Sequence, residues 1–214
     1  RLETLAAPLR ADGIRVETAI LEGKPFIALI RQVMSGSHDL LLKGASRGAD
    51  RPYLRALDLH LLRKCPCPVW ILNGETEPRA SRIMAAVDPD PGDAVRDGLA
   101  RTVMQLATSL ADQDDARIDV LNVWDVPEEA ALRHGLIHMP EAEISAVVEA
   151  ERGSSATRLQ ALTVDFEPFA DRMRVLHLRG PAADTLVEHV DREGIDTLVM
   201  GTVGRTGVAG FFIG

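Results

Sequence analysis

Five glycines crowd the last 14 residues of the chain, within LVMGTVGRTGVAGFFIG at positions 198 to 214. Glycines that directly follow a parallel strand let the backbone approach a phosphate, and the N–H groups of such a loop form an anion site. The spacing here is Gly201-x2-Gly204-x9-Gly214, which is neither the P-loop pattern nor the G-x-G-x-x-G dinucleotide pattern. The glycines alone therefore leave two interpretations open, a phosphate-binding loop and a tight connecting turn.

Three aspartates form a second candidate for ligand chemistry, in VDPDPGD at residues 87 to 93. Their spacing misses the calcium-loop pattern and the terminal Glu of that pattern is absent. We expect Asp90 to cap a helix, with Pro91 at its first position and Asp93 in its first turn. Asp88 has no capping role in this scheme and is kept as a candidate binding residue.

Histidines and serines offer weaker candidates. His134 and His138 are four residues apart, but the glycine and proline beside them favour a loop, and a third metal ligand is lacking. No G-x-S-x-G nucleophile pattern occurs, and Ser154 and Ser155 have no histidine near them in the sequence. We expect neither a structural metal site nor a serine nucleophile.

The only cysteines are Cys65 and Cys67, in KCPCPVW. They are too few for a four-ligand zinc site and lack the C-x-x-C redox spacing. We favour a structural interpretation, in which Pro66 and Pro68 end a helix and start a strand from Val69 to Leu72.

An internal repeat organises the elements that must position these residues. Residues 20 to 48 align without a gap on residues 177 to 205, at an offset of 157. Both copies carry apolar residues at i, i+3, i+4 and i+7, which predicts an amphipathic helix. The expected strands on either side of that helix are Val16 to Leu21 and Leu40 to Lys43 in the first copy, and Met173 to Leu178 and Thr197 to Met200 in the second. Strand, crossover helix and strand predict parallel pairing.

The region between the copies continues the alternation of strands and helices. Two further strands are predicted at Ile83 to Val87 and Ile118 to Val126, with helices around Val95 to Leu110 and Ile144 to Leu162. A long connecting segment, Pro127 to Glu143, precedes the second of these helices. The order of elements from Ile83 to Met200 predicts a doubly wound α/β domain.

We therefore expect an α/β chain of two tandem, doubly wound, parallel-sheet domains. Residues 1–74 are predicted to form the C-terminal part of the first domain, 75–80 a polar linker, and 81–214 the second domain. Comparison of the copies predicts that, in this chain, the first domain lacks its N-terminal part and the second its C-terminal end, beyond the glycine loop.

Composition narrows the functional classes. The chain has 214 residues, 46% hydrophobic and 26% charged, with a net charge of −8 and a pI near 5.3. This acidity and the lack of a basic stripe argue against nucleic acid as a partner. No apolar run approaches the roughly 20 residues of a membrane span, and the opening RLETLAAPLRADG does not follow a signal-peptide plan. We expect a cytoplasmic protein without a membrane partner.

The glycine spacing, preceded by Leu198-Val199-Met200 and Ile195-Asp196, resembles the adenine-nucleotide motif of the universal stress protein superfamily. With its strand-end aspartate and its two copies, the chain is most similar to the tandem-domain E type of that superfamily. The resemblance implies a Rossmann-like fold and a site for ATP or a related adenine nucleotide, with Mg²⁺ as a candidate companion. Nucleotide-binding members use an aspartate near the adenosine, strand backbone against the adenine and the glycine loop around the phosphates. The matching positions are Asp88, Val123, Met200, Gly201, Gly204 and Gly214.

The first copy departs from this motif. Gly44 is retained, but Arg47 and Leu57 stand where the second and third glycines would be. We expect at most one competent nucleotide site in the chain. The family's Ser or Thr after the third glycine has no counterpart, because the sequence stops at Gly214.

Three functions stay open at this point. The first is a nucleotide-binding sensor or regulator of the stress response that acts on an unidentified protein partner. The second is a nucleotide-free tandem scaffold, and the third is a slow ATP hydrolase. We rank the enzyme last because phosphoryl transfer needs cationic clamps, and only Arg205 lies near the loop in the sequence. The resemblance also implies an internal pseudo-dimer and leaves further homodimerisation open.

Overall fold

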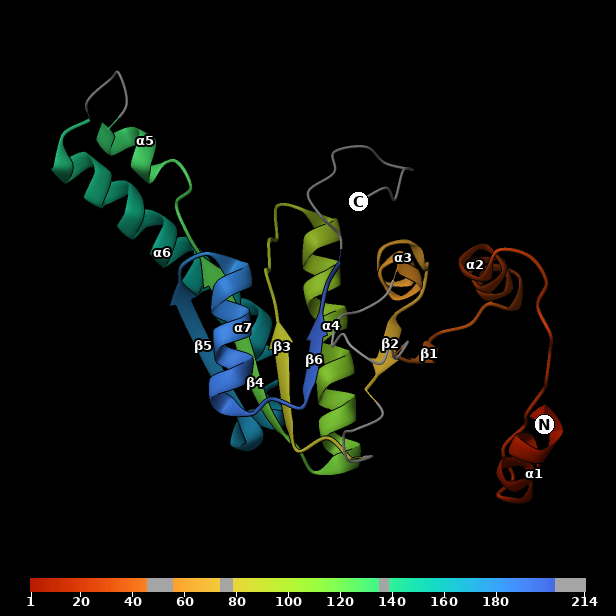
Figure 1. The fold of residues 1–214 in the computed structure, drawn as a ribbon. Helices are drawn as coiled ribbons and strands as arrows, with labels where there is room; N and C mark the ends of the chain where they lie inside the picture. Colours follow the sequence, from red (N-terminus) through yellow and green to blue (C-terminus); the bar gives the residue numbers. More distant parts are fainter. Residues whose placement is uncertain (46–55, 74–78, 135–138, 203–214) are drawn as a thin grey trace. The chain divides into compact units, whose positions relative to one another are not determined.

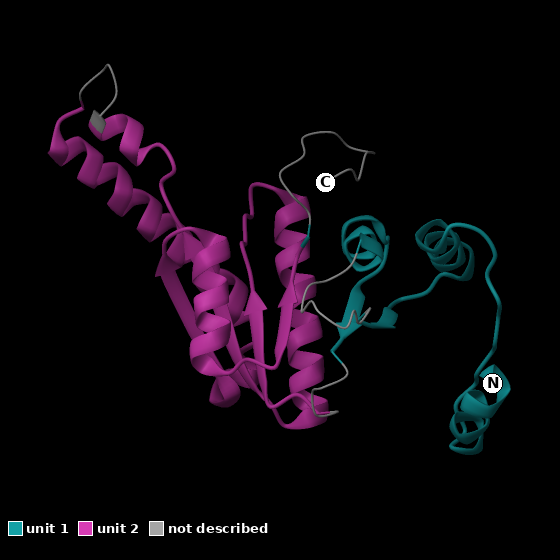
Figure 2. Cartoon of the chain, in the orientation of Figure 1, with its two compact units in different colours: residues 1–75, 202–214 teal, residues 76–201 magenta. Residues whose placement is uncertain are grey.

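The computed structural model describes residues 1–45, 56–73, 79–134 and 139–202. The chain divides into two compact units (Figure 2): unit 1 comprises residues 1–75 with Thr202, and unit 2 comprises residues 76–201. The elements of unit 1 are α1 (Leu2–Ala11), α2 (Pro25–Gly36), β1 (Leu41–Gly44), α3 (Ala56–Lys64) and β2 (Val69–Leu72). The elements of unit 2 are β3 (Arg82–Ala86), α4 (Ala94–Asp114), β4 (Arg117–Trp124), α5 (Glu129–His134), α6 (Glu141–Val164), the 3-10 helix η1 (Glu167–Arg172), β5 (Met173–Arg179), α7 (Ala182–Glu193) and β6 (Thr197–Met200).

Unit 2 is built on a four-stranded parallel sheet with the order β5-β4-β3-β6 (Figure 1). The central strand β3 pairs with β4 through Ala86 and Leu121 and with β6 through Ala86 and Met200. All strands point the same way, so their carboxyl ends meet at one edge of the sheet. The α/β fold with a parallel sheet predicted from the sequence is confirmed for this unit.

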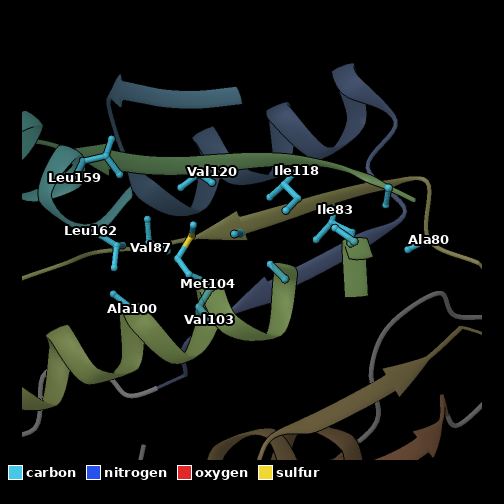
Figure 3. Close-up of a cluster of buried hydrophobic side chains, with 14 residues drawn as sticks. Ala80, Ile83, Val87, Ala100, Val103, Met104, Ile118, Val120, Leu159 and Leu162 are labelled. Atoms are coloured by element: carbon cyan, nitrogen blue, oxygen red, sulfur yellow. The ribbon is translucent and has the colours of Figure 1, made fainter. Parts of the chain in front are cut away.

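One face of the sheet carries the hydrophobic core, shown in Figure 3. Ile83 and Ala85 of β3 and Ile118 and Val120 of β4 are fully buried there, against apolar residues of α4 and α6. Alternate strand residues point to opposite faces, so Asp119 faces the other layer. That layer is α7, whose His189 Nε2 donates a hydrogen bond to Asp119 Oδ2 at 2.9 Å.

An ionic network joins α7 to the sheet. Asp119 is 5% exposed and also accepts hydrogen bonds from Arg174, of 3.0 Å from Nε and 2.5 Å from Nη2. Glu193 pairs with Arg174 at 2.9 Å and with Arg82 at 3.0 Å. Burial raises the pKa of Asp119, but the hydrogen bonds from Arg174 and His189 outweigh it and hold that pKa below its usual range. The network stabilises the face of the sheet opposite the core.

The start of α4 differs from the sequence prediction. The capping residue is Asp93, whose Oδ1 accepts from the backbone N–H groups of Val95 at 3.0 Å and Arg96 at 3.2 Å. Asp90 instead accepts from the N–H of Gly92 at 3.1 Å, which closes a local turn over Pro91. The predicted cap at Asp90 was wrong because the Pro-Gly pair favours a turn and delays the helix by three residues.

The connection from Pro127 to Glu143 also differs from its prediction. It contains α5, in which Arg133 pairs with Glu129 at 2.9 Å across one helical turn, and α6 already begins at Glu141. Helix-forming residues and this i, i+4 pair explain the extra turn of helix. Of the two histidines considered as a metal pair, His134 ends α5 and His138 lies outside the described residues.

Unit 1 contains a parallel pair of strands, β1 and β2, with Leu41 opposite Val69. Helix α2 contacts α3 through the stacked rings of Phe26 and His60, whose centroids are 4.9 Å apart. The strand predicted from Val16 to Leu21 was wrong: residues 14–22 form neither helix nor strand. A strand is held by a neighbouring strand, and the described strands of unit 1 pair with each other instead.

The two repeat copies share local structure. Helices α2 and α7 each have 12 residues, and their first residues, Pro25 and Ala182, are separated by the repeat offset. A glycine with positive φ precedes each helix, Gly23 at 103° and Gly180 at 149°. These correspondences agree with the repeat, while the tandem arrangement of two domains of one fold, each incomplete in this chain, stays a prediction. Among the described residues, no helix is long and apolar enough to cross a membrane.

We predict that Asp119→Asn lowers the free energy of unfolding of unit 2 by about 2 kcal/mol, because it leaves Arg174 and His189 with a weaker buried partner. The measurement is urea unfolding followed by Trp124 fluorescence in a Trp70→Phe background, which removes the other tryptophan. Asp112→Asn is the matched control, since that side chain is 73% exposed in its pair with Arg172 and its loss should cost below about 0.5 kcal/mol. Equal effects of the two changes would contradict a stabilising network.

We also predict a specific loss of stability in acid. The pKa of Glu193 is lowered to about 2 by hydrogen bonds from Arg174, Arg82 and Arg192, and that of Asp119 is lowered as described. Carboxyls with a lowered pKa stabilise the fold fully above their unfolded values, about 4, and this stabilisation is lost as the pH falls toward the folded-state values. The urea midpoint should therefore fall between about pH 4.5 and 2, and fall less in Asp119→Asn.

Candidate functional site

The carboxyl ends of β3 and β6 flank the topological switch point of the unit 2 sheet. From β3 the chain moves outward through β4 to β5, with α4 and α6 on the core face, and then returns by α7 on the other face to place β6 beside β3. Open α/β sheets bind ligands in the crevice at such a point, beyond the carboxyl ends of the strands. The topology therefore marks the edge where β3 and β6 end as the candidate site.

The predicted site residues that the structure describes lie along this edge. Asp88 follows β3, Gly201 follows β6, and Met200 stands opposite Ala86 of β3. Val123 lies on β4, two residues beyond the Leu121 that pairs with Ala86. Two predicted residues, Gly204 and Gly214, lie outside the described residues.

Arg96 is a cation at this edge that the sequence reasoning missed. It stands in the first turn of α4, and its guanidinium pairs with Asp88 and with Asp90, each at 2.6 Å. Burial lowers the pKa of Arg96, but the hydrogen bond and charge of Asp88 and the charge of Asp90 raise it overall. The Asp88 side chain is 63% exposed, so it stays accessible to solvent despite this pair. An arginine in the first turn of a helix that follows three aspartates was the available sequence signal.

Gly201 has a packing role of its own. A Cβ atom at this position would lie 2.4 Å from Cδ2 and 2.8 Å from Cγ of Leu99 in α4. Only a glycine lets the backbone leaving β6 approach α4 this closely without moving Leu99. The packing contact and a phosphate-binding role are compatible, because both need backbone without a side chain.

A buried chain of hydrogen bonds supports the backbone next to Asp88. Asn122 is 2% exposed, and its Nδ2 donates to the carbonyl oxygen of Val87 at 2.9 Å. Ser155 Oγ donates to Asn122 Oδ1 at 2.9 Å, and His177 Nε2 lies 3.1 Å from that hydroxyl. Burial and the charges of Arg152 and Arg158 lower the pKa of His177, which favours the neutral ring with a proton on Nε2 donated to Ser155.

The sequence places no histidine near Ser155, but the fold brings His177 of β5 to it. This pair does not form an exposed nucleophile, since Ser155 is 4% exposed and its proton is used by Asn122. The His177 ring also stacks on Trp124, with 5.6 Å between centroids, and Arg179 covers Trp124 at 5.4 Å. The polar chain and the ring stack thus position the ends of β3, β4 and β5. No group of three His, Cys, Asp or Glu side chains within the described ranges is placed to hold a metal ion.

A parallel sheet covered by helices on both faces, with an aspartate and a glycine at its switch point, defines a Rossmann-like α/β protein. More narrowly, the chain belongs to the universal stress protein family, whose model matches residues 80–214.

Relatives of known sequence and structure agree with this family. Universal stress protein E of Escherichia coli strain K12 is 28% identical over 208 residues, which cover 94% of this chain and 63% of that protein. The Universal stress protein E homolog of Haemophilus influenzae is 27% identical over 197 residues, which cover 87% of this chain and 60% of that protein. The chain therefore spans less than two thirds of these curated relatives.

Solved structures support the fold. A functionally unknown protein of Pseudomonas aeruginosa PAO1 superposes with a TM-score of 0.71 at 22% identity, covering 98% of this chain and 68% of that chain. A universal stress protein from Archaeoglobus fulgidus DSM 4304 superposes with a TM-score of 0.60 at 13% identity, covering 99% and 70%. At these identities the likeness concerns the fold alone.

We predict that Gly201→Ala costs about 1–2 kcal/mol of stability, because the new Cβ must displace Leu99. In a Leu99→Ala background the same change should cost less, with a coupling energy of at least about 0.5 kcal/mol measured by urea unfolding. Gly98→Ala on α4 is the control: no atom lies within 4 Å of its added Cβ, so this helix position should become more stable. Additive effects of Gly201→Ala and Leu99→Ala would show that the packing contact is unimportant.

Proposed function

We propose that this chain is a universal stress response protein that binds an adenine nucleotide, such as ATP, at the switch point of unit 2 and acts as a sensor or regulator. One observation carries the proposal. The sequence Gly201-x2-Gly204-x9-Gly214 starts where β6 ends, next to β3 and its aspartate, Asp88. Backbone N–H groups after a parallel strand suit phosphate binding, and this is the edge of the sheet where ligands bind.

The surroundings of Asp88 support recognition of a ligand with hydroxyl groups. Its carboxylate is largely exposed, and the buried Asn122 holds the preceding carbonyl of Val87 in place. A ligand hydroxyl that donates to Asp88 would compete with Arg96 for its oxygens, and Arg96 would then be available to an anionic group. In this proposal Val123 and Met200 line the adenosine side, and Gly201, Gly204 and Gly214 surround the phosphates, with Mg²⁺ as companion ion.

A nucleotide-free scaffold is the second candidate. The contact of Gly201 with Leu99 favours it, because packing alone explains this glycine. A tandem arrangement is supported by the matching bounds and flanking glycines of α2 and α7, and it would place an internal pseudo-dimer in one chain. A cytoplasmic location, an unidentified protein partner and further homodimerisation belong to the same proposal. Slow ATP hydrolysis stays the third candidate.

We predict micromolar binding of ATP, measured by isothermal titration with and without Mg²⁺, and its loss in Gly204→Arg. An arginine side chain would fill the loop where phosphate must approach, and we expect affinity to fall at least about tenfold, or 1.4 kcal/mol. The matched control is Gly153→Arg on α6, an exposed position with no atom within 4 Å of the added Cβ, which should leave binding unchanged.

Two outcomes would decide against the proposal. Binding that survives in Gly204→Arg would place the nucleotide elsewhere. No binding to the wild-type protein, together with no nucleotide released from the purified protein by denaturation, would favour the scaffold. If ATP binds, its hydrolysis is measured by the release of inorganic phosphate.

A further inference from the structure

The two cysteines of the chain lie side by side in unit 1. Cys65 and Cys67 occupy the junction between the end of α3 and the start of β2, and their Sγ atoms are 3.6 Å apart, within hydrogen-bonding contact. Both thiols are free and partly exposed. The sequence spacing C-x-C gave no redox pattern, but the fold places the two sulfur atoms together.

Both ends of this junction are anchored in the unit. The N–H of Cys65 donates to the carbonyl of Leu61 at 2.9 Å, and Leu61 is fully buried. On the other side, the carbonyl of Pro68 accepts a hydrogen bond from the N–H of Leu41 at 3.0 Å. Pro68 directly precedes Val69, the first β2 residue that pairs with β1. Pro66 and Pro68 also restrict the backbone between and after the thiols. The proximity of the sulfurs is therefore set by the fold, which gives each thiol a high effective concentration toward the other.

We propose that Cys65 and Cys67 form a redox-active dithiol that closes to an intramolecular disulfide when a small disulfide, such as oxidised glutathione, accepts the two electrons. Closure brings sulfur atoms now 3.6 Å apart to a bonding distance of about 2.05 Å. In the net step both protein thiols lose a hydrogen, one S–S bond forms between them, and the glutathione disulfide becomes two reduced glutathiones.

Closure takes two steps of thiol–disulfide exchange. Burial, with the hydrogen bond and charge of Cys65, raises the pKa of Cys67 to about 11, so ionisation of one thiol disfavours ionisation of the other. One of the two protein thiols, as its thiolate, attacks glutathione disulfide, forming a mixed disulfide and releasing one glutathione. The other thiol loses its proton and attacks the protein sulfur of the mixed disulfide, which breaks that bond and releases the second glutathione.

A reversible switch fits this site better than a metal site or a permanent cross-link. No third metal-ligating side chain accompanies the pair among the described residues. The disulfide would close a ring over a single intervening residue, Pro66. A loop this short adds little chain-entropy stabilisation, and disulfides at exposed positions, as these partly exposed thiols would form, are the readily reduced, regulatory ones.

The test is a glutathione redox titration of the full chain, quenched with acid and analysed by intact mass. We expect the native protein to lose two hydrogens without dimerising, at a glutathione disulfide level at least about tenfold below that needed by the same chain unfolded in urea. Cys67→Ser and Cys65→Ser should each stop at one glutathione adduct, on Cys65 and on Cys67 respectively. Because the chain has only these two cysteines, each mass change identifies which sulfur atoms have reacted.

Several results would overturn the proposal. They are stable glutathione adducts or disulfide-linked dimers in the wild-type protein, thiols that do not react until the chain is unfolded, and equal titration midpoints for the folded and unfolded chain. The last would show that the fold does not prearrange the pair. Each readout is independent of nucleotide binding, so failure of the proposed function leaves this test intact.

Discussion

Parallel pairing of β3 on both of its edges is the constraint on which the rest of unit 2 depends. Because β4 and β6 run the same way as β3, the carboxyl ends of all three strands must meet at one edge. Asp88 after β3, Val123 near the end of β4 and Gly201 after β6 are brought to that edge as a result. Burial on both faces enforces the pairing: Ile83 and Ala85 point into the core under α4, while Met84 is fully buried on the opposite face. A shift of one residue in β3 would exchange these faces and move Asp88 out of line with Gly201.

Buried polar groups in unit 2 fix the positions of helices that apolar packing alone does not determine. Asn122 is a polar residue on the core face of β4. Its amide N–H donates to the Val87 carbonyl, and its amide oxygen accepts from the Ser155 hydroxyl. On the opposite face of the sheet, the buried carboxylate of Asp119 is hydrogen-bonded by His189 of α7. Both groups would be costly without partners, so each accepts only one arrangement of the elements around it. The apolar core supplies most of the buried surface, and these two sets of hydrogen bonds define how α6 and α7 pack on the sheet.

Periodicity and the repeat predicted most of the fold of unit 2, because strand and helix patterns are local. The strand predicted from Thr197 to Met200 has the observed bounds, and the twin helices begin at the expected offset. Long-range partners explain what was missed. Residues 16–21 have a strand-like pattern, but none of the strands in the described part of the chain pairs with them, and His177 meets Ser155 only through the alignment of β5 beside β4. The Asp93 cap was missed for a local reason, the turn chemistry of Pro91 and Gly92.

Charge at the candidate site constrains how the proposed nucleotide would bind. Asp88 and Asp90 share one arginine, Arg96, so this group carries a net negative charge, in a chain whose net charge is −8. A polyphosphate is repelled by both, and surface pairs such as these cannot reverse that repulsion in water. Apart from Arg96, if a ligand hydroxyl releases it from Asp88, attraction in this proposal would come from backbone N–H groups at close range and from a counter-ion on the phosphates, so binding would need side-chain-free backbone after β6. The packing of Leu99 against position 201 favours glycine there by itself, so under this proposal packing and recognition would select the same residue for two separate physical reasons.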